Sequence, residues 1–327
     1  MGNHEYVQNV NAEQCLLDGA VKLFVKNTAQ PVKYHTEING FHFITANVSD
    51  FSCGIKKETE EWVENEISEV LKNYSDNKPI FVIIHEPIQE TVIGSESNKT
   101  SNYSKEFKQF LNRDSRIVFL CGHIHTAAQN PRTIWQDGFT VIHSPHTCVG
   151  ALANDGIKNE EAVWRISQGL IIGVKNNYIK VFKIDFNTHL MIGEPWEIDI
   201  NTGKAGFLYT DKRFKESNRP YFESNAEIEA SIGSDGITEI CFTRAVCEAY
   251  GKNQDGFAAS YNIKVTEINS KKLVSDLWYQ ADYYYTVPRI TPLFKRINGL
   301  SKGVGYIFEI YAANPFGKVS SEPLKKK

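Results

Sequence analysis

Two histidines that follow a short apolar run are the residues best suited to chemistry in this chain. The run Ile117–Cys121 reads IVFLC and predicts a strand buried on both faces, and Gly122 after it lets the backbone turn. His123 and His125 come next. In an extended segment, residues two apart point to the same side, so we expect both imidazoles to leave the strand end together. Paired imidazoles placed in this way can share a metal ion, whereas the alternative is a pair of solvated loop histidines.

Two other segments offer ligands of the same kind. Asn3 and His4 lie in the opening residues, MGNHE, with no strand before them. His85 follows a second apolar run, Ile80–Ile84, and is followed in turn by Glu86. In an open α/β sheet, binding sites form at the carboxyl ends of such strands. We therefore expect His85 and the histidine pair, which follow buried strands, to lie at one edge of a sheet, and Asn3-His4 is a third segment that offers ligands.

Four further histidines have less specific settings. His35 and His42 lie in alternating patterns on either side of a predicted turn, which favours strand-face residues over ligands. His143 and His146 follow the predicted strand after His125. They are either substrate contacts at the rim of the site or ordinary loop histidines, and the sequence leaves both interpretations open.

The elements that position these residues alternate between strands and helices over about the first 145 residues, which predicts a layered α/β arrangement. Asn39-Gly40 is a two-residue hairpin turn, and apolar residues at helical spacing predict a helix over 58–74 with one buried stripe. The long polar segment 89–104 predicts a functional loop. The expected strands are 20–26, 32–38, 41–46, 80–84, 117–121 and 140–143, and a short helix is expected over 104–111.

The rest of the chain predicts mainly β structure in two units. A β meander is expected to close the first domain, and a small all-β sandwich of about 100 residues is expected at the carboxyl end. Polar residues 203–224 predict a linker, so the domains are 1–202 and 225–327. The strands expected in these parts are 169–174, 178–185, 195–200, 226–232, 239–246, 260–268 and 306–313.

The composition limits the classes of partner. The 327 residues suggest about two domains. A net charge of -3 gives no case for nucleic acid or an anionic membrane as partner. No apolar run approaches ~20 residues, so no transmembrane segment is expected. The six cysteines show no Cys-x-x-Cys spacing, which favours thiols and leaves the redox compartment open.

Taken in order, these motifs resemble those of the calcineurin-like metallophosphoesterase superfamily. The matching segments are GNHE at 2–5, IFVIIHEP at 80–87 and CGHIH at 121–125, and residues 169–186 look like the closing strands of that family. Each motif is weak alone, but the ordered set, which covers about residues 1–200, is specific. The resemblance implies a layered metallophosphoesterase-type β-sandwich with flanking helices.

The resemblance also implies roles for individual residues. Asn3, His85 and His123 would bind one divalent metal ion, His125 would bind a second, and His4 would act as general acid beside the leaving oxygen. A metal-activated water would hydrolyse a small-molecule phosphate ester, and Zn, Mn or Fe would suit the ligands.

Part of the family pattern is missing. An Asp-x-His pair and a Gly-Asp-x-x-Asp motif precede Gly-Asn-His in the family, and neither precedes Gly2 here. These carboxylates normally lie between the two cations, which repel strongly at a separation of about 4 Å. The remaining ligands are neutral, so at most one divalent ion is expected, held by Asn3, His85 and His123, and activity is expected to be absent or impaired.

We interpret the chain as the carboxyl-terminal part of a phosphoesterase truncated before Gly2. A degenerate relative is the alternative, as is a non-catalytic binding or scaffolding protein on the same fold. If central strands are missing, Ile80–Ile84 or Ile117–Cys121 should lie at an open, aggregation-prone edge.

The carboxyl-terminal strands resemble the end of a fibronectin type III module. Leu300 and Tyr306 occupy the corner positions of that fold, and Asn314–Lys318 would be its last hairpin turn. Such modules are common on exported enzymes, so the resemblance is compatible with export of a full-length parent. Five aromatic residues are expected to pack in the core rather than line a ligand face: Trp278, Tyr279 and Tyr283–Tyr285.

Overall fold

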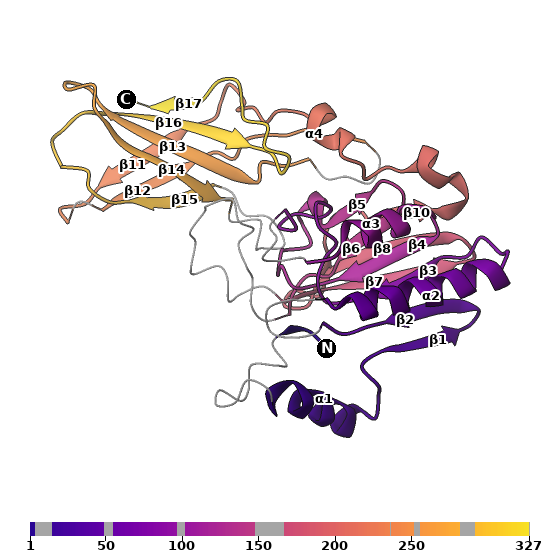
Figure 1. Ribbon diagram of the computed structural model, residues 1–327. Coiled ribbons are helices and arrows are strands. Elements are labelled where there is room, and N and C mark those ends of the chain that lie inside the picture. The colour runs from indigo at the N-terminus through magenta and orange to yellow at the C-terminus, as the bar shows by residue number, and fades with distance from the viewer. Residues whose placement is uncertain are drawn as a thin grey trace.

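The computed structural model describes residues 1–3, 15–48, 55–96, 102–147, 167–235, 237–251, 256–281 and 292–326. Within these ranges the chain is mixed α/β, with one six-stranded sheet, its helices and three antiparallel sheets (Figure 1). The candidate acid His4 and the aromatic residues Tyr283–Tyr285 lie outside the described residues.

The six-stranded sheet positions the candidate ligands. Its order is β1-β2-β3-β4-β6-β5, with β2, β3, β4 and β6 parallel and the two outer strands antiparallel. The two central strands are wholly apolar because helices cover one face and a second sheet covers the other. The strands are β1 (Tyr34–Ile38), β2 (Phe41–Thr45), β3 (Ile80–Ile83), β4 (Ile117–Cys121), β5 (Ile134–Gln136) and β6 (Thr140–His143).

The expectation of an open edge at β3 or β4 is wrong. β3 pairs with β2 on one side and β4 on the other, and β4 pairs with β3 and β6. The physical reason is that the β1–β2 hairpin supplies a parallel neighbour for β3. Its turn is the expected one, because Asn39 and Gly40 both have positive φ, at 54° and 76°.

The α-helices described in this part of the chain are α1 (Cys15–Thr28), α2 (Lys57–Asn73) and α3 (Lys105–Leu111). The stripe of α2 that was expected to be buried includes Val63 and Ile67, both with no exposed surface. Ser104 caps α3 by accepting a hydrogen bond from the Phe107 amide at 3.1 Å. The strand expected over 20–26 is wrong: these residues belong to α1, because a short apolar run does not distinguish helix from strand.

An antiparallel sheet packs on the other face of the six-stranded sheet, as expected for a closing meander. Its strands are β7 (Gln168–Lys175), β8 (Tyr178–Asp185), β9 (Leu190–Met191) and β10 (Trp196–Asp199), with β8 paired to the other three. Phe81, Val118 and Ile142 of the larger sheet pack against Val181 and Trp196 of the smaller.

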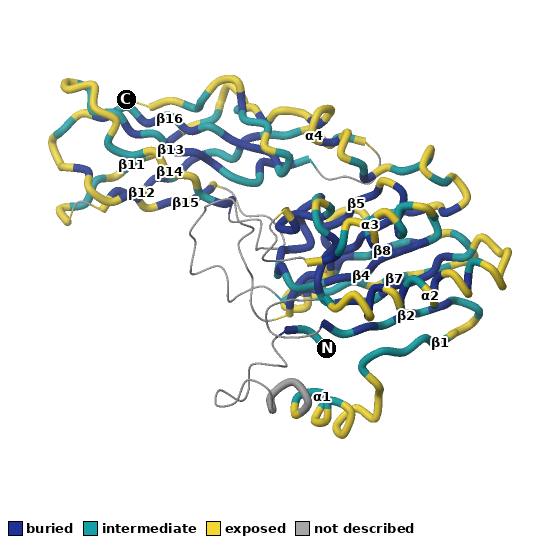
Figure 2. Tube along the Cα trace, viewed as in Figure 1, coloured by how far each residue is buried: buried dark blue, intermediate teal, exposed yellow. Residues whose placement is uncertain are grey.

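A β-sandwich follows at the carboxyl end, and its core is one buried cluster (Figure 2). One sheet has the order β11-β12-β15 and the other β14-β13-β16-β17. Leu300 is buried, and the Tyr306 hydroxyl accepts a hydrogen bond from the Ser301 amide at 3.0 Å. The strands are β11 (Ile228–Ile232), β12 (Thr238–Phe242), β13 (Ser260–Glu267), β14 (Leu273–Gln280), β15 (Leu293–Ile297), β16 (Tyr306–Ala313) and β17 (Leu324–Lys326).

Residues 203–224, which were expected to form a linker, are folded and packed. They include the end of the 3-10 helix η4 (Ile200–Gly206) and the helix α4 (Lys212–Glu216). Arg213 of α4 is buried and donates hydrogen bonds to the carbonyl oxygens of Pro131 and Ile134, both at 2.7 Å. The polar composition of the segment therefore reflects buried hydrogen bonding as well as exposure.

No helix among the described residues is long and apolar enough to cross a membrane.

Candidate metal centre

The candidate ligands meet at the carboxyl ends of β3 and β4. His85 follows β3, and its carbonyl oxygen accepts a hydrogen bond from the Gly122 amide at 2.8 Å, which joins the two strand ends. The Nε2 atom of His85 lies 3.1 Å from Oδ1 of Asn3. The ring of His85 is 5.2 Å from that of His123, centre to centre, in an edge-on arrangement. The structure thus brings Asn3, His85 and His123 together.

Glu86 joins this group, which the sequence reasoning missed. One ligand atom from each of His85, Glu86 and His123 lies within 4.8 Å of the others, and Glu86 has no exposed surface. The set of ligands expected from the sequence did not include this carboxyl group. The signal was present in the sequence, because Glu86 directly follows a histidine at the end of a buried strand.

The backbone at His123 and His125 differs from the expected extended form. Both residues have positive φ, at 74° and 57°, in the left-handed region that side chains other than glycine rarely adopt. Gly122, which was expected to make the turn, has no positive φ. The spacing rule for an extended segment therefore does not apply to these two residues. Strained backbone of this kind is frequent at functional sites.

His125 belongs instead to a second group of histidines. Its ring lies 6.0 Å from that of His146, centre to centre. His143, at the end of β6, is 1% exposed, and His146 is 9% exposed. Burial, reinforced by the neighbouring histidines, lowers the pKa of His143 to about 3 and that of His146 to about 4. Both rings are therefore neutral at pH 7 and cannot provide positive charge for a phosphate.

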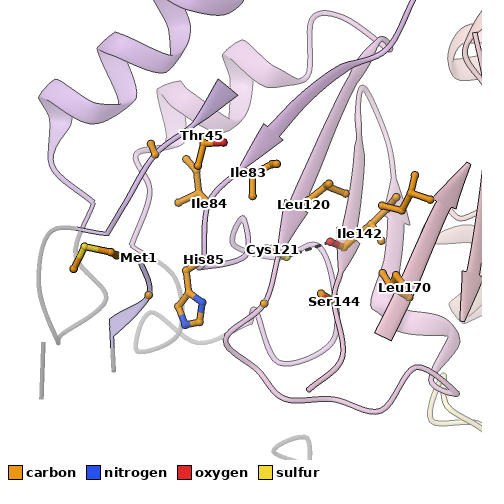
Figure 3. Close-up of a pocket in the computed structure, with 14 residues that line it drawn as sticks. Met1, Thr45, Ile83, Ile84, His85, Leu120, Cys121, Ile142, Ser144 and Leu170 are labelled. Atoms are coloured by element: carbon orange, nitrogen blue, oxygen red, sulfur yellow. Dashed lines mark hydrogen bonds between the residues drawn. The ribbon is translucent and has the colours of Figure 1, made fainter. Parts of the chain in front are cut away.

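An apolar cavity of about 430 Å³ opens beside the first group. Figure 3 shows the His85 ring at the end of its strand, with Met1 on one side and Cys121 and Ser144 on the other. Gly2 lines the same cavity. Burial raises the pKa of the Cys121 thiol far above its ordinary range.

The donor set of the first group fits a divalent transition metal ion. A metal–nitrogen bond of about 2.1 Å puts an ion about 3.2 Å from the ring centre, so two ligating imidazoles at a tetrahedral angle have centres about 5 Å apart. The 5.2 Å between His85 and His123 matches this value. Two imidazoles and a carboxylate, with an amide oxygen beside them, suit Zn, Mn or Fe.

Comparisons with known proteins do not assign the chain to a family. No family model matches it, and no curated protein matches it. Among solved structures, the crystal structure of the Clostridium perfringens spore cortex lytic enzyme SleM is similar at 12% identity over 82% of this chain and 74% of that chain. Its TM-score of 0.19 is too low to support an argument about fold or activity.

Proposed function

We propose that this protein is a metal-dependent phosphoesterase. The observation that supports the proposal is the convergence of Asn3, His85, Glu86 and His123 at the carboxyl edge of the two central strands. The metallophosphoesterase resemblance agrees with it, as does the packing of the β7–β10 sheet against the six-stranded sheet. The carboxyl-terminal sandwich would correspondingly be a fibronectin type III-like module.

A divalent ion held by these residues would supply a Lewis acid and an activated water for attack on phosphorus. The residues themselves have distinct tasks. His85 and His123 would offer neutral imidazole nitrogens, and Glu86 would offer the one negative charge of the group. Asn3 would orient the His85 ring through its side-chain oxygen, 3.1 Å from Nε2. The adjoining apolar cavity would accommodate the organic part of an ester.

Hydrolysis of an aryl phosphate by the full chain, with Zn²⁺ or Mn²⁺ added after chelator treatment, tests the proposal. We expect slow turnover that requires the metal. His85→Ala and His123→Ala should each reduce the rate of turnover at least tenfold. His189→Ala, which removes an exposed histidine between β8 and β9, is the matched control and should retain the wild-type rate. Metal binding without any hydrolysis above that of His85→Ala would contradict the proposal and favour a binding protein.

A further inference from the structure

The candidate ligand His123 lies at the centre of a strained turn. The Ile124 amide donates a hydrogen bond to the Gly122 carbonyl oxygen at 2.9 Å, two residues earlier in the chain. With the φ of 74° at His123, this bond makes a γ-turn of the rare form that has a positive φ at its centre. His125 also has a positive φ, of 57°. Backbone of this kind persists only where the surrounding structure holds it in place.

Ile124, which lies between the two histidines, is packed tightly enough to hold this turn. Its side chain is 8% exposed and belongs to the hydrophobic cluster between the helices and the six-stranded sheet. It also lies directly against Gly94, because a Cβ atom built there would be 2.5 Å from Cγ2 of Ile124. That separation is too short for two carbon atoms, so only glycine leaves room for the Ile124 side chain.

Gly94 belongs to a compact turn that is fixed on both sides. Ser95, the next residue, has no exposed surface, and its hydroxyl accepts a hydrogen bond from the Thr91 amide at 2.9 Å. On the other side, the Ile93 amide donates to the Arg132 carbonyl oxygen at 3.0 Å. Gly94 can therefore act as a stop for a side chain that packs against it.

The two segments in this contact are those that carry the candidate ligands. His85 and Glu86 begin the segment that leads to Gly94, and His123 directly precedes Ile124. The contact therefore joins the two sides of the metal centre at a point away from the ligand atoms. Supporting contacts of this kind fix the orientation of ligands, and metal affinity depends on that orientation.

We propose that Ile124 is a positioning residue for the metal centre. Seated against Gly94, it holds His123 in the turn that places its imidazole beside His85 and Glu86. The inference rests on the proposed function, because it concerns the geometry of the same site. It goes further by assigning that geometry to the fit between two residues that offer no ligand atom. Their sizes must match, so the two positions should respond to substitution as a pair.

Titration of the metal-free full chain with Co²⁺ tests the proposal, with affinity and the visible absorption of the bound cobalt as readouts. In Gly94→Ala the new Cβ displaces Ile124, so we expect binding weaker by about tenfold or more, with an altered spectrum. Ile124→Leu keeps the number of carbon atoms but has no Cγ2. Adding Gly94→Ala to Ile124→Leu should therefore weaken binding by less than about threefold, as expected for residues in direct contact.

Two controls separate positioning from general stability and from backbone strain. Ile67→Ala removes a side chain of the same hydrophobic cluster from α2, so it should lower stability and keep the wild-type affinity and spectrum. Ile124→Ala should instead weaken Co²⁺ binding by about tenfold or more. Gly303 has a φ of +85° with open space around it, so Gly303→Ala adds comparable strain and should keep the wild-type affinity.

Wild-type Co²⁺ affinity in Gly94→Ala or in Ile124→Ala would overturn the inference. Effects of Gly94→Ala and Ile124→Leu that simply multiply would also overturn it, as would an equal loss of affinity in Ile67→Ala. A wild-type chain that binds no Co²⁺ would refute both the inference and the phosphoesterase. The expected pattern of affinities without hydrolysis of an aryl phosphate would leave the inference intact and refute the phosphoesterase.

Discussion

Gly2 lies against the ring of His85, and no side chain fits there. A Cβ atom built on Gly2 would be 2.8 Å from three atoms of that ring. The contact is with a candidate ligand rather than with backbone, so the ring must move if the space is filled. Gly2 therefore contributes to the metal centre by its size alone, beside Asn3, which contributes through its side-chain oxygen.

We predict that Gly2→Ala weakens divalent metal binding at the metal centre by at least tenfold with little change in stability. The added methyl group displaces the His85 ring. The distance between a metal ion and its ligand atom tolerates a change of only about 0.2 Å, so the displaced ring binds the ion less well. Isothermal titration calorimetry with the divalent metal ion measures the change in affinity. Gly173→Ala is the control, since a Cβ there would meet only the Lys180 carbonyl oxygen at 3.8 Å. Equal affinity in Gly2→Ala and the wild type would show that His85 is not a ligand.

At the scale of elements, two glycines differ in whether their position could accept a side chain. Gly40 has a φ of +76° in the β1–β2 turn, and a Cβ there would be 2.7 Å from the Lys78 amino group. Gly19 lies within α1 with no positive φ and open space around it. The first position requires glycine, whereas the second would accept a better helix former.

We predict that Gly40→Ala lowers the free energy of unfolding by about 1–2 kcal/mol, because a left-handed conformation is unfavourable for a residue with a Cβ. Gly19→Ala should instead leave it unchanged or raise it by up to about 1 kcal/mol. Urea denaturation of the two variants and the wild type measures both changes. A stable Gly40→Ala would mean that the hairpin beside β3 is not held by this turn.

At the scale of the whole molecule, α4 connects the layered part of the chain to the carboxyl-terminal sandwich. Besides its bonds to Pro131 and Ile134, the Arg213 guanidinium lies 5.3 Å from the centre of the Phe316 ring. Asn314, in the hairpin turn after β16, donates to the Ser217 hydroxyl at 3.1 Å and to the Asn218 carbonyl oxygen at 2.7 Å. The two parts therefore share buried polar contacts.

We predict that Arg213→Lys lowers the free energy of unfolding by about 2 kcal/mol or more, since an ammonium group cannot reproduce the planar fork of donors. The same variant should be cut faster by protease within residues 203–224. Arg296→Lys is the matched control: its side chain is 75% exposed and should change stability by less than about 0.5 kcal/mol. Wild-type stability and protease resistance in Arg213→Lys would mean that the segment acts only as a linker.

The sequence alone determined those helices, strands and turns that are indicated by residues close together in the chain. Apolar runs predicted β3 and β4, Asn39-Gly40 predicted the hairpin turn, and Ser104 stood at the start of a predicted helix. The proximity of His85 and His123 was also predicted, because residues at the carboxyl ends of adjacent parallel strands must be close, whereas the place of Asn3 beside them was implied only by the family resemblance.

Only the tertiary structure decided where the side chains beyond those strand ends lie. Positive φ at His123 and His125 takes both residues out of the extended form, and no spacing rule for an extended segment could show it. The pairing of β4 with β6 places His143 beside His125, and Gln168 fastens His146 next to it. These contacts depend on strand order and on loop conformations held by distant residues. Short-range pattern therefore predicted the strands, whereas long-range packing decided which residues form each group.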